Sequence, residues 1–133
     1  GNGCGGGNML DIIATNAISI DSFRTSFGAA AATVNVHYKQ GSFVGSDQTP
    51  GDWTLLGSTT VSGGGAQVFS VGSSLSISAG DTVGIYIEAD VVYTTLTGNT
   101  TYTNSDLSIN TGLGLCGSFS GVNNPRGWNG AVF

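Results

Sequence analysis

Charged side chains are scarce in this sequence: they make up 8% of its 133 residues, whereas an average soluble domain has about one quarter. Basic side chains are the rarest, with three Lys and Arg against eight Asp and Glu. A surface for nucleic acid or an anionic membrane needs clustered cations. Arg24, Lys39 and Arg126 are far apart in the sequence and predict neither partner. Long apolar runs are also missing, so we expect no segment that inserts into a membrane.

Cysteine is limited to Cys4 and Cys116, whose spacing fits neither a zinc site nor a CxxC motif. Two interpretations stay open. One is a disulfide, within one chain or between neighbouring chains, as in exported proteins. The other is a pair of buried thiols that pack as small hydrophobic side chains. The start at GNGCGGGN, without Met, is typical of a product from which a signal peptide has been removed. It predicts an extracellular or cell-surface location.

Alternation with a period of two is the pattern that is present, and no segment keeps a helical period. In the run 34–39, Val34, Val36 and Tyr38 alternate with polar residues, which predicts a strand with His37 on its water-facing side. Turn residues separate such runs at the spacing of a sandwich or barrel. We therefore predict one all-β domain over residues 1–133, a jelly-roll-like antiparallel β-sandwich of about ten short strands. A glycine-rich arm covers residues 1–7.

Turn chemistry predicts several connections. Pro50-Gly51 suits the centre of a type II turn. Gly98-Asn99 suits the turn of a hairpin between two tyrosine-containing strands. Residues 123–127 are expected to form a loop before the last strand. The alanine run at 28–32 is too short for a stable helix and is expected to be a loop.

Side chains for catalysis or metal binding form no convincing group. His37 is the single histidine, and no G-x-S-x-G motif accompanies it. Asp47 and Asp52 flank a turn, and acidic residues also occur at 88–90 and 104–106. Each cluster offers only two ligands, whereas Ca²⁺ takes six to eight, and nothing selects a glycosidase carboxylate pair. We therefore expect no enzyme, no metal and no cofactor, and no catalytic role for His37, Asp47 or Asp52.

Two features of the sequence suggest a connection with glycans, one by binding and one by covalent attachment. Tyr86, Tyr93 and Tyr102 could form an exposed row on neighbouring strands, on which a sugar could stack. Ordinary packing within the sheet is the favoured interpretation, and Trp53 is expected in the core. Asn99 begins the N-x-[ST] sequence Asn-Thr-Thr and is a candidate for glycosylation at a hairpin tip.

A series of short motifs extends along nearly the whole chain. They are G-N-G at 1–3, N-M-L-D-I at 8–12, I-S-I-D-S-F at 18–23, V-H-Y-K-Q-G-S-F-V-G at 36–45, W-T-L-L-G at 53–57, S-A-G-D-T-V-G-I-Y at 78–86, S-D-L-S-I at 105–109 and W-N-G at 128–130. In this order they resemble a class of secreted bacterial β-sandwich domains that occur in large exported surface proteins of uncharacterised role. The resemblance implies an exported β-sandwich and transfers no catalytic motif. Cys4 and Cys116 are not part of the pattern.

The predicted function is structural: a subunit that self-assembles into an extracellular fibre or surface coat. Low charge weakens the repulsion that keeps proteins monomeric. The alternative is a glycan-binding or adhesin module of an exported surface protein. Self-assembly is expected through the chain ends, because the glycine-rich arm lacks apolar side chains of its own and the other end is apolar. The candidate residues are Gly1, Asn2, Gly3, Trp128, Val132 and Phe133. Both ends would otherwise complete their own sandwich.

Overall fold

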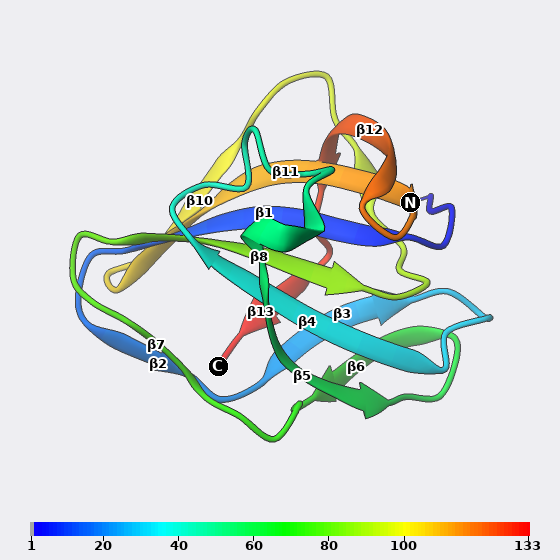
Figure 1. Ribbon diagram of the computed structural model, residues 1–133, viewed down its shortest axis with the longest axis horizontal. Helices are drawn as coiled ribbons and strands as arrows, with labels where there is room; N and C mark the ends of the chain where they lie inside the picture. The colour runs from blue at the N-terminus through cyan, green and yellow to red at the C-terminus, as the bar shows by residue number, and fades with distance from the viewer. Residues whose placement is uncertain (1) are drawn as a thin grey trace.

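Two packed layers of strands form the molecule (Figure 1), and within the described residues every strand ladder of each sheet is antiparallel. The structure is a computed structural model that describes residues 2–133. Within this range there are thirteen strands and one short 3₁₀ turn. The predicted all-β, jelly-roll-like sandwich is confirmed. None of the helical segments in residues 2–133 is long and apolar enough to cross a membrane.

The larger sheet has the strand order β5-β4-β8-β1-β11-β12-β9, with β10 beside the first half of β11. Its central strands β8 and β1 are the most apolar, as expected for strands covered on both faces. The strands of this sheet are β1 (Gly7–Ala14), β4 (Thr33–Gln40), β5 (Thr54–Thr60), β8 (Thr82–Glu88), β9 (Thr94–Thr95), β10 (Thr101–Thr103), β11 (Leu107–Gly117) and β12 (Ser120–Gly127).

The second layer consists of two smaller sheets, β13-β3-β6 and β2-β7. The chain passes from one to the other at residues 21–22, directly between β2 and β3. The strands of this layer are β2 (Ile18–Ile20), β3 (Phe23–Phe27), β6 (Gly65–Phe69), β7 (Leu75–Ile77) and β13 (Gly130–Val132).

The main hydrophobic core lies between the two layers. Alternate residues of β1, namely Leu10, Ile12 and Ala14, belong to it. Across from them, the Phe69 ring lies 5.7 Å from that of Phe23, centroid to centroid, within the β3–β6 pair. Burial of such side chains is the main stabilising term, at about 1.5–3 kcal/mol for each large one.

A second hydrophobic cluster covers the opposite face of the larger sheet, where the sequence predicted water. Loop 41–53, with the 3₁₀ turn η1 (Pro50–Asp52), and the β11–β12 connection fold over this face. The His37 ring stacks on Tyr86 at 5.3 Å and meets the edge of Phe119. The prediction of a water-facing His37 is therefore wrong, because its cover comes from loops distant in sequence. Trp53 belongs to this cluster, as predicted.

Three turn predictions are also wrong. Pro50-Gly51 begins the 3₁₀ turn η1 instead of a type II turn. Residues 123–127 lie within strand β12, paired with β11 and β9, and do not form a loop. Gly98-Asn99 does not turn a hairpin, because β9 pairs with β12 while β10 pairs with β11. The last two errors concern pairing with a distant strand, whereas the first concerns the type of a local turn. The expected loop at 28–32 is confirmed.

Candidate functional site

A disulfide between Cys4 and Cys116 joins the N-terminal arm to β11 within one chain. This confirms the disulfide interpretation and leaves no free cysteine in the described range. Both cysteines are exposed, so the disulfide lies at the surface, where it joins the residues before β1 to the end of β11. Its effect is to hold the arm against β11.

The glycine-rich arm is held by contacts with its own chain. The amide of Asn2 donates to the Tyr93 carbonyl at 2.7 Å, and the amide of Tyr93 donates back at 2.7 Å. Gly3 lies so close to the next segment that a Cβ there would be 2.1 Å from the Val91 carbonyl oxygen. Gly1 lies outside the described residues.

The C-terminal segment is also paired within the chain. Strand β13, which contains Val132, pairs with β3. The indole N–H of Trp128 donates to the Thr25 hydroxyl. The Phe133 amide donates to the Ser22 carbonyl at 3.0 Å, while its side chain is exposed. The contacts described for Asn2, Gly3, Trp128, Val132 and Phe133 thus come from the same chain, and their role in assembly stays a prediction.

Within residues 2–133, the strands at the edges of the sheets share one property: they carry no charged residue. In this range seven strands lie at an edge or in the short two-stranded sheet, namely β2, β5, β6, β7, β9, β10 and β13. Natural β-proteins often place a charged residue, especially Lys, or a Pro on such strands to prevent pairing with a second chain. Here Leu55 of β5 is 53% exposed and Val68 of β6 is 61% exposed.

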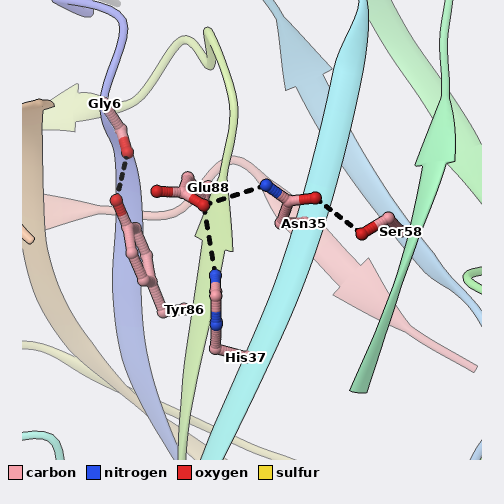
Figure 2. A network of polar contacts seen from close by, with 6 residues as sticks. All are labelled: Gly6, Asn35, His37, Ser58, Tyr86 and Glu88. Carbon is pink, nitrogen blue, oxygen red and sulfur yellow. Dashed lines mark hydrogen bonds and ion pairs between the residues drawn. The ribbon is translucent and has the colours of Figure 1, made fainter. Parts of the chain in front are cut away.

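A polar network crosses β8, β4 and β5 beside the second cluster (Figure 2). His37 Nε2 lies 3.2 Å from Glu88 Oε1, and the Asn35 amide donates to the same oxygen at 3.0 Å. The Ser58 hydroxyl donates in turn to Asn35 at 2.6 Å. Burial raises the pKa of Glu88, but hydrogen bonds from Ser118, Asn35 and His37 outweigh it, and the net pKa is lowered. Glu88 therefore stays ionised and anchors the network.

Tyr86 extends this arrangement to the arm, since its hydroxyl donates to the Gly6 carbonyl at 2.6 Å. Burial first, and then the charge of Glu88, raise the pKa of Tyr86, so its phenol remains protonated. No hydroxyl or thiol nucleophile in residues 2–133 is hydrogen-bonded to His37. These hydrogen bonds connect β4, β5, β8 and the arm, and their role is to stabilise the packing of these segments.

Asp52, Asp90 and Asn104 stabilise local turns and loops. Asp52 accepts the Ser46 hydroxyl at 2.7 Å, inside the loop that covers the second cluster. Asp90 accepts the amide of Ala30 at 3.1 Å. Asn104 accepts the amide of Asp106 at 2.8 Å in a local turn. Across residues 2–133, no three His, Cys, Asp or Glu side chains gather as a metal site would require.

The three tyrosines do not form an exposed row, and the favoured interpretation, ordinary packing within the sheet, is correct for Tyr86 and Tyr93. Tyr86 and Tyr93 are buried, one in each hydrophobic cluster, and only Tyr102 is exposed, at 58%. Tyr102 lines a cleft of about 320 Å³ together with Trp128. The sequence could not separate the three tyrosines, because both faces of the larger sheet are covered.

A second cleft, of about 250 Å³, is lined by residues of which the sequence analysis singled out only Asn99. We call it the polar cleft, and it is defined by Asp11, Val44, Asn99, Thr101, Asn110 and Thr111. One signal was present in the sequence: Asp11 interrupts the otherwise apolar run Met9–Ile13. A charged residue in a central strand is uncommon unless it has partners. Asn99, the glycosylation candidate, is exposed at the rim of this cleft.

Comparisons of the chain with protein-family models, with curated proteins and with solved structures found no match in any of the three.

Proposed function

We propose that this protein is a structural subunit that self-assembles into an extracellular fibre or surface coat. The observation that carries the proposal is the absence of charge from the edge strands. An edge strand presents unpaired N–H and C=O groups, which can pair with an edge of another copy by strand addition. Because the side chains of β5 and β6 are neutral, no repulsion opposes such pairing.

The two most suitable edges lie on the same side of the sandwich. β5 ends the larger sheet, and β6 ends one of the smaller sheets. The two are close, since a Cβ at Gly57 in β5 would lie 2.4 Å from the carbonyl oxygen of Val71, two residues beyond β6. Leu55 and Val68 add exposed apolar surface on these strands. An incoming copy would bury this surface and complete a sheet at once.

Other features support an exported subunit without catalytic activity. A disulfide persists in oxidising compartments and is rare in the cytosol, and the chain contains one at its surface. In residues 2–133, His37 is hydrogen-bonded to Glu88 but to no hydroxyl or thiol nucleophile, and Asp52 accepts a serine hydroxyl within a loop, so neither forms a nucleophile–base pair of the kind that hydrolases use. The proposal therefore includes that the protein is not an enzyme.

The test is a lysine placed on each edge strand. We expect the unaltered protein to form filaments or sheets, seen by electron microscopy and by sedimentation. Leu55→Lys and Val68→Lys should abolish them, because lysine is the residue that natural edges use against pairing. Ser105→Lys, in an exposed turn away from both edges, adds the same charge and serves as the control. A protein that stays monomeric at high concentration, or filaments unaffected by both edge variants, would contradict the proposal.

A glycan-binding or adhesin module is the second candidate function. The row of exposed tyrosines that could have stacked against a sugar is not formed. The polar cleft favours this function instead, because its lining is rich in amides and hydroxyls. Such groups are the usual partners of sugar hydroxyls, as both donors and acceptors.

A further inference from the structure

The polar cleft lies on the outer face of the larger sheet, at an irregularity in its pairing. Asp11 of β1 pairs with Asn110, whereas Met9 pairs with Leu113, so β11 contains one extra residue at this point. Side chains of consecutive strand residues normally point to opposite faces. Here Asn110 and Thr111 both line the cleft, which the extra residue allows. β-bulges of this kind are frequent beside binding sites, where they redirect a side chain.

The wall of the cleft is held in place before any ligand arrives. The Thr100 amide donates to the Thr111 hydroxyl at 2.9 Å, and the Thr111 amide donates to the Thr100 carbonyl at 2.9 Å. Next to it, the Thr101 hydroxyl donates to Asn110 Oδ1 at 2.8 Å. This segment is therefore bonded to β11 by backbone and side chains, and a ligand would bind with little loss of conformational freedom.

Asp11 is the chemically distinctive residue of the cleft. Its side chain is only 6% exposed, and no cation in residues 2–133 forms an ion pair with it. Oδ1 accepts the Phe43 amide at 2.9 Å, and Oδ2 accepts the Ser42 hydroxyl. Nearby Lys39 donates instead to the Gln40 and Ser42 carbonyls. A carboxylate has about four acceptor positions, so each oxygen of Asp11 can accept one more donor.

The lining indicates which class of ligand fits. Asp11 is its only charged member, and the others are amides and hydroxyls together with Phe43 and Val44, the latter 73% exposed. An anion would find no cation there. A calcium site normally has several carboxylates among six to eight oxygens, and this cleft has one. An apolar ligand would leave the polar groups unpaired. A neutral sugar has hydroxyls for the polar groups and a C–H face for Val44.

We propose that the polar cleft binds one neutral sugar residue of a glycan. Asp11 accepts hydrogen bonds from two sugar hydroxyls, the Asn99 amide contributes a further contact at the rim, and Val44 packs against the apolar face of the ring. This assignment rests on the second candidate function and gives it a location. It does not depend on self-assembly through the edge strands.

The test uses the intact protein, made in a host without N-glycosylation so that the Asn99 amide is free, and a panel of methyl glycosides of glucose, galactose, mannose and N-acetylglucosamine. Saturation-transfer NMR observes the sugar, so it works with single subunits and with filaments. We expect saturable transfer to at least one glycoside. Asp11→Asn should weaken binding about tenfold or more, because it removes hydrogen bonds to a charged acceptor. Asn99→Ala, at an exposed loop position where folding is not at risk, should weaken it severalfold.

Two control variants separate the polar cleft from other sites. Thr97→Ala changes an exposed residue of the same loop that does not line the cleft, and it should leave the affinity unchanged. Tyr102→Ala alters the other cleft and should also have no effect. The assignment is overturned if no glycoside binds, or if Tyr102→Ala abolishes binding while Asn99→Ala does not. Filaments are scored on the same samples, so the loss of sugar binding alone leaves the assembly proposal standing.

Discussion

Removal of the disulfide offers a quantitative test of how the two ends of the chain stabilise the fold. The paired change Cys4→Ser and Cys116→Ser opens a loop with a sequence separation of 112 residues and leaves no free thiol. In the chain-entropy model, a loop of this length corresponds to about 4.8 kcal/mol at 25 °C. Since domains of this size are stable by about 5–15 kcal/mol, the loss would be a large fraction of the total.

The structure also indicates why the measured loss should not exceed that figure, since native contacts other than the disulfide hold the arm in place. The amide of Gly6 donates to the Leu115 carbonyl at 2.9 Å, and Asn2 is paired with Tyr93 through two backbone hydrogen bonds. These contacts can persist without the disulfide and keep the arm in place. We therefore expect a loss of about 3–5 kcal/mol in the free energy of unfolding.

Urea unfolding followed by tryptophan fluorescence is the assay. Trp53 lies in the second hydrophobic cluster and Trp128 packs against the main core, so the two report on both faces of the larger sheet. The variant should also have a larger m-value, because an unlinked unfolded chain exposes more surface. Unaltered protein treated with a reductant should match the variant. A loss below about 1 kcal/mol with an unchanged m-value would refute the chain-entropy reasoning.

Three further predictions concern single side chains. Gly112→Ala should lower the free energy of unfolding by about 3 kcal/mol or more, because its Cβ would lie 1.6 Å from a backbone oxygen of β1. The control Gly98→Ala, with open space around the new Cβ, should change it by no more than about 0.5 kcal/mol. Equal losses in the two variants would contradict the tight packing of β11 on β1. The folded-state pKa of Glu88 is lowered, so its carboxylate adds stability that is present above its usual pKa of 4.5 and is lost as the pH falls. Glu88→Gln should therefore be less stable than the unaltered protein at neutral pH, and the gap in denaturation midpoint should close in acid; a pH-independent gap would show that the charge is not responsible. Asn99 should carry a glycan when the protein is made in a host with N-glycosylation, seen as an intact mass above that of the bare chain and removed by Asn99→Gln.

Local sequence patterns determined the fold class and the positions of most strands. Alternation in runs such as 34–39 and 83–87 depends only on neighbouring residues, as do breaks at Gly-rich segments, so both are readable without a structure. The pairing of Cys4 with Cys116 was favoured by their number and by the exported character of the chain. The scarcity of charge, which underlies the proposed assembly, is likewise a property of composition alone.

Only the tertiary structure decided what each strand faces. His37 was expected in water because alternation cannot say whether a distant loop covers the second face of a sheet, and loop 41–53 does so. Asp11 belongs to a cleft because a one-residue irregularity places it beside Asn110, about a hundred positions away in sequence. The sequence showed which strands lack charge, but it did not show which strands lie at the edge of a sheet. Which strand remains unpaired depends on every other pairing in the sheet, and that is a long-range property of the folded chain.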